Sequence, residues 1–297
     1  MKNPKIYIGP AGWSYPDWRG AFYPAKLERG ESELRFLANH FNLVEINSTF
    51  YRVPSVKSVK NWLHQVESLP DFRFCCKLHQ KFTHESGTFS EKEVDEFKNA
   101  IQPLTENGRL LTLLLQFPWS FKYKPDNRRY LLRLLKAFSE LPLAIEMRHQ
   151  SWDTPKFLSY LMEKSHTFVN IDQPVIGQSI KITNYVTSKL VYFRFHGRNY
   201  DNWFNSDAGQ NQRYDYLYSA EEQNEFLELI EQKMTEDTVL IIVFNNHFRG
   251  KAIANGFQIK HHFEKVKQNI PESLIRFYPE LKVIALKDPV GKTMNLF

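Results

Sequence analysis

Acidic, basic and amide residues alternate with apolar ones near the ends of several short apolar runs. The pattern is clearest in the segments 44–47 (VEIN), 145–148 (IEMR) and 193–196 (FRFH). Alternate residues of a β-strand point to the same side, so the polar side chains of each segment would share one face. Charged groups are rarely buried without partners, so polar faces that converge would either pair with one another or bind a ligand.

Three of these residues are candidates for proton transfer, namely Glu45, Glu146 and His196. A carboxylate in a partly dry cavity can have a raised pKa, which suits a general acid or base. The other polar residues are candidates for binding the substrate: Asn47, Lys77, Gln116, Arg148, Asp172, Arg194, Arg198 and Asn245. Because guanidinium groups match phosphate and carboxylate, we expect the ligand to be a small anion.

The same residues also allow a purely structural interpretation. Glu146 with Arg194, or Glu45 with Lys77, would then form salt bridges that only stabilise the interior. Structural pairs should appear at either end of a barrel, whereas these polar residues gather where each apolar run stops. We therefore favour a ligand site and keep the salt bridges as its alternative.

The sequence gives little support for a metal site. Glu146, Asp172 and His196 form the best candidate set, but no H-x-H or H-E-x-x-H spacing accompanies them. Cys75 and Cys76 are adjacent on a predicted strand, so their side chains would point to opposite faces and a disulfide between them is unfavourable. We predict no metal ligands, and no motif identifies a cofactor.

Eight apolar runs would carry the polar residues, with amphipathic stretches between most of them. The runs cover residues 5–9, 43–47, 72–79, 110–117, 143–148, 167–172, 190–196 and 239–245. Alternating buried strands and helices are typical of a parallel sheet, and eight repeats favour a (β/α)₈ barrel. An open, doubly wound sheet is the rival, but no G-x-G-x-x-G or Walker loop follows any run. We predict a single TIM-like α/β barrel domain over residues 1–297.

Local sequence signals indicate where helices begin and where long loops replace them. Ser90 and Ser219 are each followed three residues later by glutamate, which is the pattern of a capping box. Residues 173–189 lack a helical pattern, and 197–218 form a long stretch rich in Tyr, Asn and Asp. We expect long irregular loops after the sixth and seventh strands, where binding functions often lie.

Composition sets the broad class of protein. With 297 residues, 42% of them hydrophobic, the chain can bury a large core, which excludes intrinsic disorder. No signal-peptide pattern is visible, and the most apolar stretch is far shorter than the roughly 20 residues of a membrane span. We expect a cytoplasmic protein that does not bind membranes. The net charge of +6 favours anionic ligands only weakly, and the oligomeric state stays open.

Eight motifs occur in order along residues 6–256. They are GPAGWSY (9–15), VEINSTFY (44–51), FRFCCK (72–77), LQFP (115–118), AIEMR (144–148), DQP (172–174), YFRFHGR (192–198) and FNN (244–246). In this ordered set the chain resembles the DUF72 family, also called the YecE-like family. The resemblance implies a TIM-like barrel and no particular reaction, because the family is named for having no assigned function.

The leading hypothesis is an enzyme that acts on an anionic substrate by hydrolase- or lyase-like acid–base chemistry. Phosphorylated and nucleotide-like compounds are the candidate substrates. One alternative is a nucleic-acid-binding or repair-related protein, for which the basic stretch 122–136 is the main feature. A solvated helix face is the commoner origin of such a stretch. The other alternative is a noncatalytic protein that binds a small anion in the same cavity.

Overall fold

Eight parallel strands form one sheet in the order β1-β8-β7-β6-β5-β4-β3-β2 in the computed structural model, which describes residues 4–85, 87–201, 203 and 213–287. The strands are β1 (Lys5–Pro10), β2 (Leu43–Ile46), β3 (Arg73–Lys77), β4 (Leu110–Gln116), β5 (Leu143–Glu146), β6 (Thr167–Asp172), β7 (Leu190–Phe195) and β8 (Val239–Phe244). Beyond the end of β1, Ala11 bridges to Glu45 of β2, and the Gly12 amide donates to the Glu45 carbonyl at 2.8 Å. The sheet is therefore a nearly closed TIM-like barrel, as predicted.

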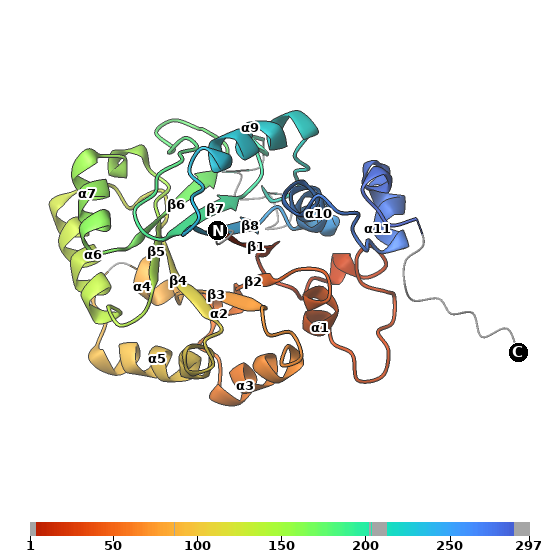
Figure 1. The fold of residues 1–297 in the computed structure, drawn as a ribbon. Helices are drawn as coiled ribbons and strands as arrows, with labels where there is room; N and C mark the ends of the chain where they lie inside the picture. Colours follow the sequence, from red (N-terminus) through yellow and green to blue (C-terminus); the bar gives the residue numbers. More distant parts are fainter. Residues whose placement is uncertain (1–3, 86, 202, 204–212, 288–297) are drawn as a thin grey trace, which may run out of the picture.

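Helices surround the strands (Figure 1). They are α1 (Glu33–Ala38), α2 (Ser48–Tyr51), α3 (Val56–Gln65), α4 (Gln80–Thr83), α5 (Glu91–Glu106), α6 (Pro125–Ala137), α7 (Pro155–Glu163), α9 (Ala220–Glu231), α10 (Lys251–Glu264) and α11 (Glu272–Phe277). Both predicted capping boxes are present, at Ser90 of α5 and at Ser219 of α9. Each box satisfies backbone amides that the first helical turn leaves without partners, so it fixes where the helix begins.

Apolar side chains fill the layer between strands and helices. On α6, Leu131, Leu134 and Leu135 are buried at helical spacing. On the outer face of β7, the Phe195 ring lies 4.6 Å from the ring of Phe226 on α9, measured between centroids. Burial of side chains of this size contributes roughly 1.5–3 kcal/mol each, so this layer stabilises the barrel and holds the strand ends in place.

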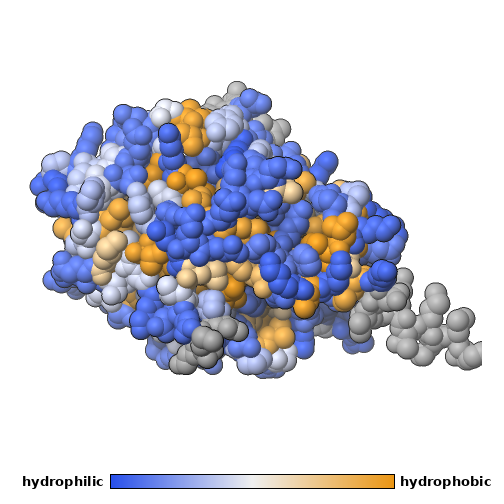
Figure 2. All heavy atoms as spheres, turned by 45° about the horizontal axis from the view of Figure 1, so that its top comes forward, coloured by the Kyte–Doolittle hydropathy of each residue, from blue (hydrophilic) through white to orange (hydrophobic). Residues whose placement is uncertain are grey.

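On the face that Figure 2 shows, hydrophilic side chains cover much of the surface, and hydrophobic ones appear between them. Leu132, Met162 and Phe277 are examples of large exposed hydrophobic side chains. In the described part of the chain, no helix has both the length and the apolar character that crossing a membrane requires.

The strand register shows which side chains face the barrel interior. Arg194 of β7 pairs with Ile171 of β6 and with Val243 of β8, and residues paired across neighbouring strands point to the same side. Arg194 reaches Glu45 across the barrel, so Ile171 also faces inward. As a substrate-binding candidate, Asp172 is expected to face inward with the other polar residues. The register reverses this facing, and Asp172 points outward.

The segment after β6 gives the physical reason for this reversal. As predicted, residues 173–189 form no helix, so irregular backbone covers the outer face of β6. Asn170 pairs with this backbone: its side-chain oxygen accepts from the Tyr185 amide at 2.8 Å, and its nitrogen donates to the Tyr185 carbonyl at 3.0 Å. A covering helix would pair its own backbone groups, but irregular backbone needs other partners. The outward-facing Asn170 of β6 supplies such partners to the segment that covers the strand. The predicted loop at 197–218 lies partly outside the described residues; 197–201 and 214–218 are irregular.

Candidate functional site

A cavity of about 560 Å³ opens at the carboxyl ends of the strands. This volume is in the range of small-molecule binding sites. Eleven of its wall residues carry amide, imidazole, ammonium or guanidinium groups: Asn47, Lys77, Gln80, His84, Gln116, Arg148, Gln173, Arg194, Arg213, Asn245 and His247. A larger groove of about 1180 Å³ runs along α5 outside the barrel and contains none of the predicted site residues.

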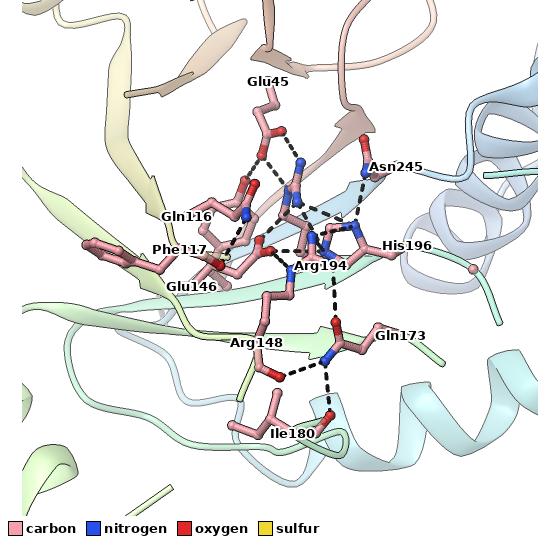
Figure 3. Close-up of polar contacts among 12 residues, drawn as sticks. Glu45, Gln116, Phe117, Glu146, Arg148, Gln173, Ile180, Arg194, His196 and Asn245 are labelled. Atoms are coloured by element: carbon pink, nitrogen blue, oxygen red, sulfur yellow. Dashed lines mark hydrogen bonds and ion pairs between the residues drawn. The ribbon is translucent and has the colours of Figure 1, made fainter. Parts of the chain in front are cut away.

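Arg194 lies at the centre of a charged network beneath the cavity (Figure 3). Its guanidinium donates to both carboxylate oxygens of Glu45, at 2.9 and 2.7 Å, and to Glu146 at 2.9 Å. The hydroxyl of Tyr192 also donates to Glu45 at 2.6 Å. Glu45 and Glu146 are fully buried, and Arg194 is 1% exposed. Glu45, Arg194 and Glu146 thus satisfy one another by charge-assisted hydrogen bonds in a dry environment.

Glu146 extends the network toward the cavity. Arg148 donates from Nε to Glu146 at 2.7 Å and from an Nη to Gln173 at 3.1 Å, so two contacts fix its guanidinium. His196 lies between the two arginines, with its Nε2 3.2 Å from Glu146. The side-chain nitrogen of Asn245 lies 2.9 Å from Nδ1 of His196, within hydrogen-bond distance.

These contacts change the protonation expected from the sequence. Burial opposes ionisation of Glu146, but Arg194 and Arg148 outweigh it and hold its pKa well below the ordinary value. The expectation of a raised pKa is wrong for this carboxylate, because two guanidiniums contact it. Burial, reinforced by Arg148, holds the pKa of His196 well below its ordinary value. Glu146 is therefore a fixed anion and His196 a neutral ring.

The salt-bridge interpretation is correct for one pair and wrong for the other. Glu146 contacts Arg194 as that interpretation expected. The partner of Glu45 is also Arg194, and no carboxylate of the described residues forms an ion pair with Lys77. The two carboxylates and the two arginines balance in charge, which leaves Lys77 as an additional cation.

Lys77 lies at the end of β3 and lines the cavity. Its Nζ is 3.9 Å from the centroid of the Phe50 ring. Burial, followed by the repulsion of Arg194, lowers the pKa of Lys77 to about 7, although Glu45 and Glu146 oppose this change. A buried amine that has no carboxylate partner is easily deprotonated, and such a lysine can act as an anion contact, a base or a nucleophile.

Two further polar atoms of the wall lack hydrogen-bond partners among the described residues. They are Oδ1 of Asn47 and Nδ1 of His247, and both are buried. The His247 ring stacks on Tyr15 at a centroid distance of 4.3 Å, and burial lowers the pKa of this histidine to about 4. A buried polar atom without a partner costs free energy, so a ligand with hydroxyl, amine or carbonyl groups would stabilise this wall.

Sequence reasoning missed several residues of the cavity. His84 follows α4, and its Nε2 lies 3.5 Å from the side-chain nitrogen of Gln116. His247 follows β8. These two histidines lie in the loops after the strands, where the alternation within strands does not apply. Trp203, one of the aromatic residues that follow the strands and are candidates for a pocket wall, covers Arg148 with 5.5 Å between the guanidinium and the ring. The aromatic residues that follow the strands were the available signal, because such loops line the mouth of a TIM barrel.

Asp172 and Arg198 do not line the cavity. Arg198 donates from Nε to Asp172 at 3.0 Å and from an Nη to Glu222 of α9 at 3.0 Å. Asp172 also accepts from the Tyr218 hydroxyl at 2.6 Å. The two residues thus form an ion pair between the barrel and α9. Asp172 points away from Glu146 and His196, so the structure does not bring together these three residues, the best metal candidates of the sequence. No group of three or more metal-ligating residues that could hold an ion occurs in the described ranges.

The fold and the mouth together define a class: a TIM-like barrel with a charged cavity at the carboxyl ends of its strands. A family model described as "Protein of unknown function DUF72" matches residues 7–276, and the chain belongs to this family.

Named relatives and solved structures agree with this assignment. The UPF0759 protein YunF of Bacillus subtilis is 30% identical over 268 residues, which are 86% of this chain and 93% of that protein. The UPF0759 protein YecE of Escherichia coli is 32% identical over 48% of each chain. The crystal structure of a DUF72 family protein from Thermotoga maritima has a TM-score of 0.78 at 35% identity and covers 88% of this chain and 99% of its own. A DUF72 family protein from Enterococcus faecalis has a TM-score of 0.75 at 26% identity and covers 98% of this chain and 100% of its own.

Proposed function

We propose that this protein is an enzyme of the hydrolase or lyase class that binds a small anionic substrate in the cavity at the barrel mouth. The observation that carries the proposal is Lys77, a partly buried cavity cation that no carboxylate of the described residues pairs with. An anionic group of the substrate would supply the missing charge. Arg148 lines the same cavity and would make the second contact through its guanidinium.

The uncharged residues of the cavity wall indicate that the ligand has other groups besides its negative charge. Asn47 and His247 each present a buried polar atom to this wall that has no hydrogen-bond partner among the described residues. Trp203, Tyr214 and Phe50 add aromatic surface to the same cavity. A phosphorylated or carboxylated molecule with hydroxyl or amine groups would contact the cations, the polar atoms and the aromatic rings of the cavity.

The reactive group of this enzyme would be Lys77 rather than a carboxylate. Glu146 accepts from Arg194 and Arg148, which hold its pKa well below the ordinary value, so it does not take up a proton readily. Both carboxylate oxygens of Glu45 accept hydrogen bonds from Arg194 and are not free to contact a substrate. A pKa of about 7 lets Lys77 exchange a proton near neutral pH.

The basic stretch 122–136 gives no comparable support for nucleic-acid binding. Its residues lie mostly on α6, outside the barrel. Arg133 lies over the Phe89 ring at 4.4 Å, Arg128 lies over Tyr123, and Arg129 pairs with Asp126. These arginines therefore cover neighbouring side chains of the helix layer.

Calorimetric titration with inorganic phosphate tests the anion site. We expect the wild type to bind phosphate, and Arg148→Met and Lys77→Met each to weaken binding at least about tenfold, the loss of one charge-assisted contact. Lys98→Met is the matched control, because Lys98 lies over a phenyl ring outside the barrel and should bind as the wild type does. Unchanged affinity in both cavity variants would contradict the proposal.

Incubation with a metabolite extract tests the catalytic part. The wild type and Lys98→Met should consume an anionic compound that Lys77→Met leaves intact, as followed by mass spectrometry. Phosphate binding without consumption of any anionic compound would instead favour the noncatalytic alternative.

A further inference from the structure

We propose that Lys77 forms a covalent imine with the carbonyl group of a substrate that also carries a carboxylate or phosphate. This inference rests on the anion site proposed above. It names both the substrate class and the kind of chemistry that the cavity performs.

The backbone holds Lys77 rigidly at the edge of the cavity. Its carbonyl oxygen accepts from the Thr49 hydroxyl at 2.6 Å, and the next amide, of Leu78, donates to the Leu114 carbonyl at 2.9 Å. The side chain then extends over the Phe50 ring and into the cavity. A nucleophile needs such a fixed origin, because an oriented amine reacts faster than a freely moving one.

The surroundings of Lys77 favour the free amine. Phe50 offers an apolar face, and Arg194 and Arg148 add positive charge nearby. Desolvation and neighbouring cations are the two means by which proteins activate a lysine as a nucleophile. With a pKa of about 7, about a thousandfold more of this amine is neutral at pH 7 than of an ordinary lysine with pKa near 10.4.

Arg148 is placed to hold the anionic end of such a substrate. Glu146 and Gln173 fix its guanidinium from two sides, and the side chain still lines the cavity. A carboxylate or phosphate bound there would bring an adjacent carbonyl carbon toward Lys77. Proximity of this kind substitutes for the higher concentration that a free amine would need.

Covalent chemistry fits this cavity better than paired acid–base catalysis does. Acid–base catalysis at a bond usually needs two groups whose pKa values differ. Both carboxylates under the cavity are engaged by Arg194, and His84 has a pKa lowered to about 4 by burial and by Lys77. Imine formation by lysine needs one neutral amine, which apolar and positively charged surroundings favour. The cavity has both kinds of surroundings around Lys77.

The reaction balances without a cofactor. The neutral amine of Lys77 adds to the carbonyl carbon, and the nitrogen transfers a proton to the former carbonyl oxygen. That oxygen takes one further proton from solvent and leaves as water, so that a protonated C=N bond joins Lys77 to the substrate. The protonated imine withdraws electrons from the neighbouring carbon, which promotes the cleavage of a C–C or C–H bond there. This is the chemistry of a lyase, and it sharpens the class proposed above.

Reductive trapping tests the inference. The protein is incubated with pyruvate and sodium cyanoborohydride at pH 7, digested, and mapped by mass spectrometry. We expect the label on Lys77 to form at least about tenfold faster than on any surface lysine, because of its larger neutral fraction. Lys77→Arg should lose this label, and Lys98→Arg should keep it. With pyruvate, Arg148→Met should label Lys77 at least about tenfold more slowly than the wild type does. With acetone, which has no carboxylate, the slowing should be smaller, because only the loss of the nearby positive charge then acts on the Lys77 amine.

The outcomes separate this inference from the proposed function. A label spread over surface lysines, with Lys77 no faster than the rest, would overturn the inference. If phosphate still binds in that case, the anion site stands and only the covalent step is wrong. If the wild type binds no phosphate and Lys77 takes no label, both proposals are wrong. A folded Lys77→Arg protein, checked by circular dichroism, ensures that loss of label reports loss of the amine.

Discussion

Two arginine–carboxylate clusters lie near the carboxyl ends of the strands, and they differ in what surrounds them. The inner cluster joins Arg194 to Glu45 and Glu146 inside the barrel. The outer cluster joins Arg198 to Asp172 and Glu222 between the barrel and α9. Only the inner cluster borders the cavity. The comparison shows that paired charges occur both at the cavity and away from it, so they do not by themselves mark a site. We propose that Lys77 marks it instead, because no carboxylate of the described residues pairs with this lysine beside the inner cluster.

The clusters also differ in how much water reaches them. The side chains of the inner cluster are at most 1% exposed, whereas those of Arg198 and Glu222 are 24% and 18% exposed. An ion without a partner costs far more in a dry interior than at a wet edge. Breaking the inner cluster should therefore cost more stability than breaking the outer one.

The largest effect is expected for Arg194→Met. This change leaves two buried carboxylates without their shared partner, which should lower the free energy of unfolding by about 3–5 kcal/mol. Urea denaturation followed by circular dichroism measures the loss. The control is Arg129→Met, because Arg129 pairs with Asp126 on the surface and its side chain is 74% exposed. A loss no larger than that of the control would show that the inner cluster is not buried as described.

A smaller effect is expected for Asp172→Asn. Arg198 keeps Glu222, and asparagine can still accept from the Tyr218 hydroxyl, so the free energy of unfolding should fall by about 1–3 kcal/mol. Phosphate affinity, measured by calorimetry, should stay at the wild-type value because the outer cluster lies outside the cavity. A loss of phosphate binding in this variant would remove the distinction between the two clusters.

The sequence predicts most of the barrel because buried strands and amphipathic helices have different hydrophobic periods. All eight predicted strands are present, and the capping boxes at Ser90 and Ser219 begin the helices expected there. The facing of β6 could not be predicted in this way. Both faces of that strand are buried, so alternation of Asn170 with Val169 does not reveal which side faces the interior.

The inward facing of some candidate site residues could be predicted from the sequence, but their contacts could not. Glu45, Glu146 and Arg194 face inward because they lie within regular strands, where the period of two applies. Their pairing depends on the distance across the barrel, which no local pattern contains. For that reason the sequence favoured Glu45 and Glu146 as catalytic groups, whereas the contacts around Lys77 make the lysine the better candidate.

The most direct measurement is the pKa of Lys77 by heteronuclear NMR of lysine labelled with ¹³C, with the Lys77→Arg spectrum for assignment. Our account predicts a titration midpoint at about pH 7 for Lys77. Inorganic phosphate should raise that midpoint, because a bound anion stabilises the ammonium form. An ordinary midpoint near 10.4, unmoved by phosphate, would contradict the claim that Lys77 is a partly buried cavity amine that binds an anionic substrate.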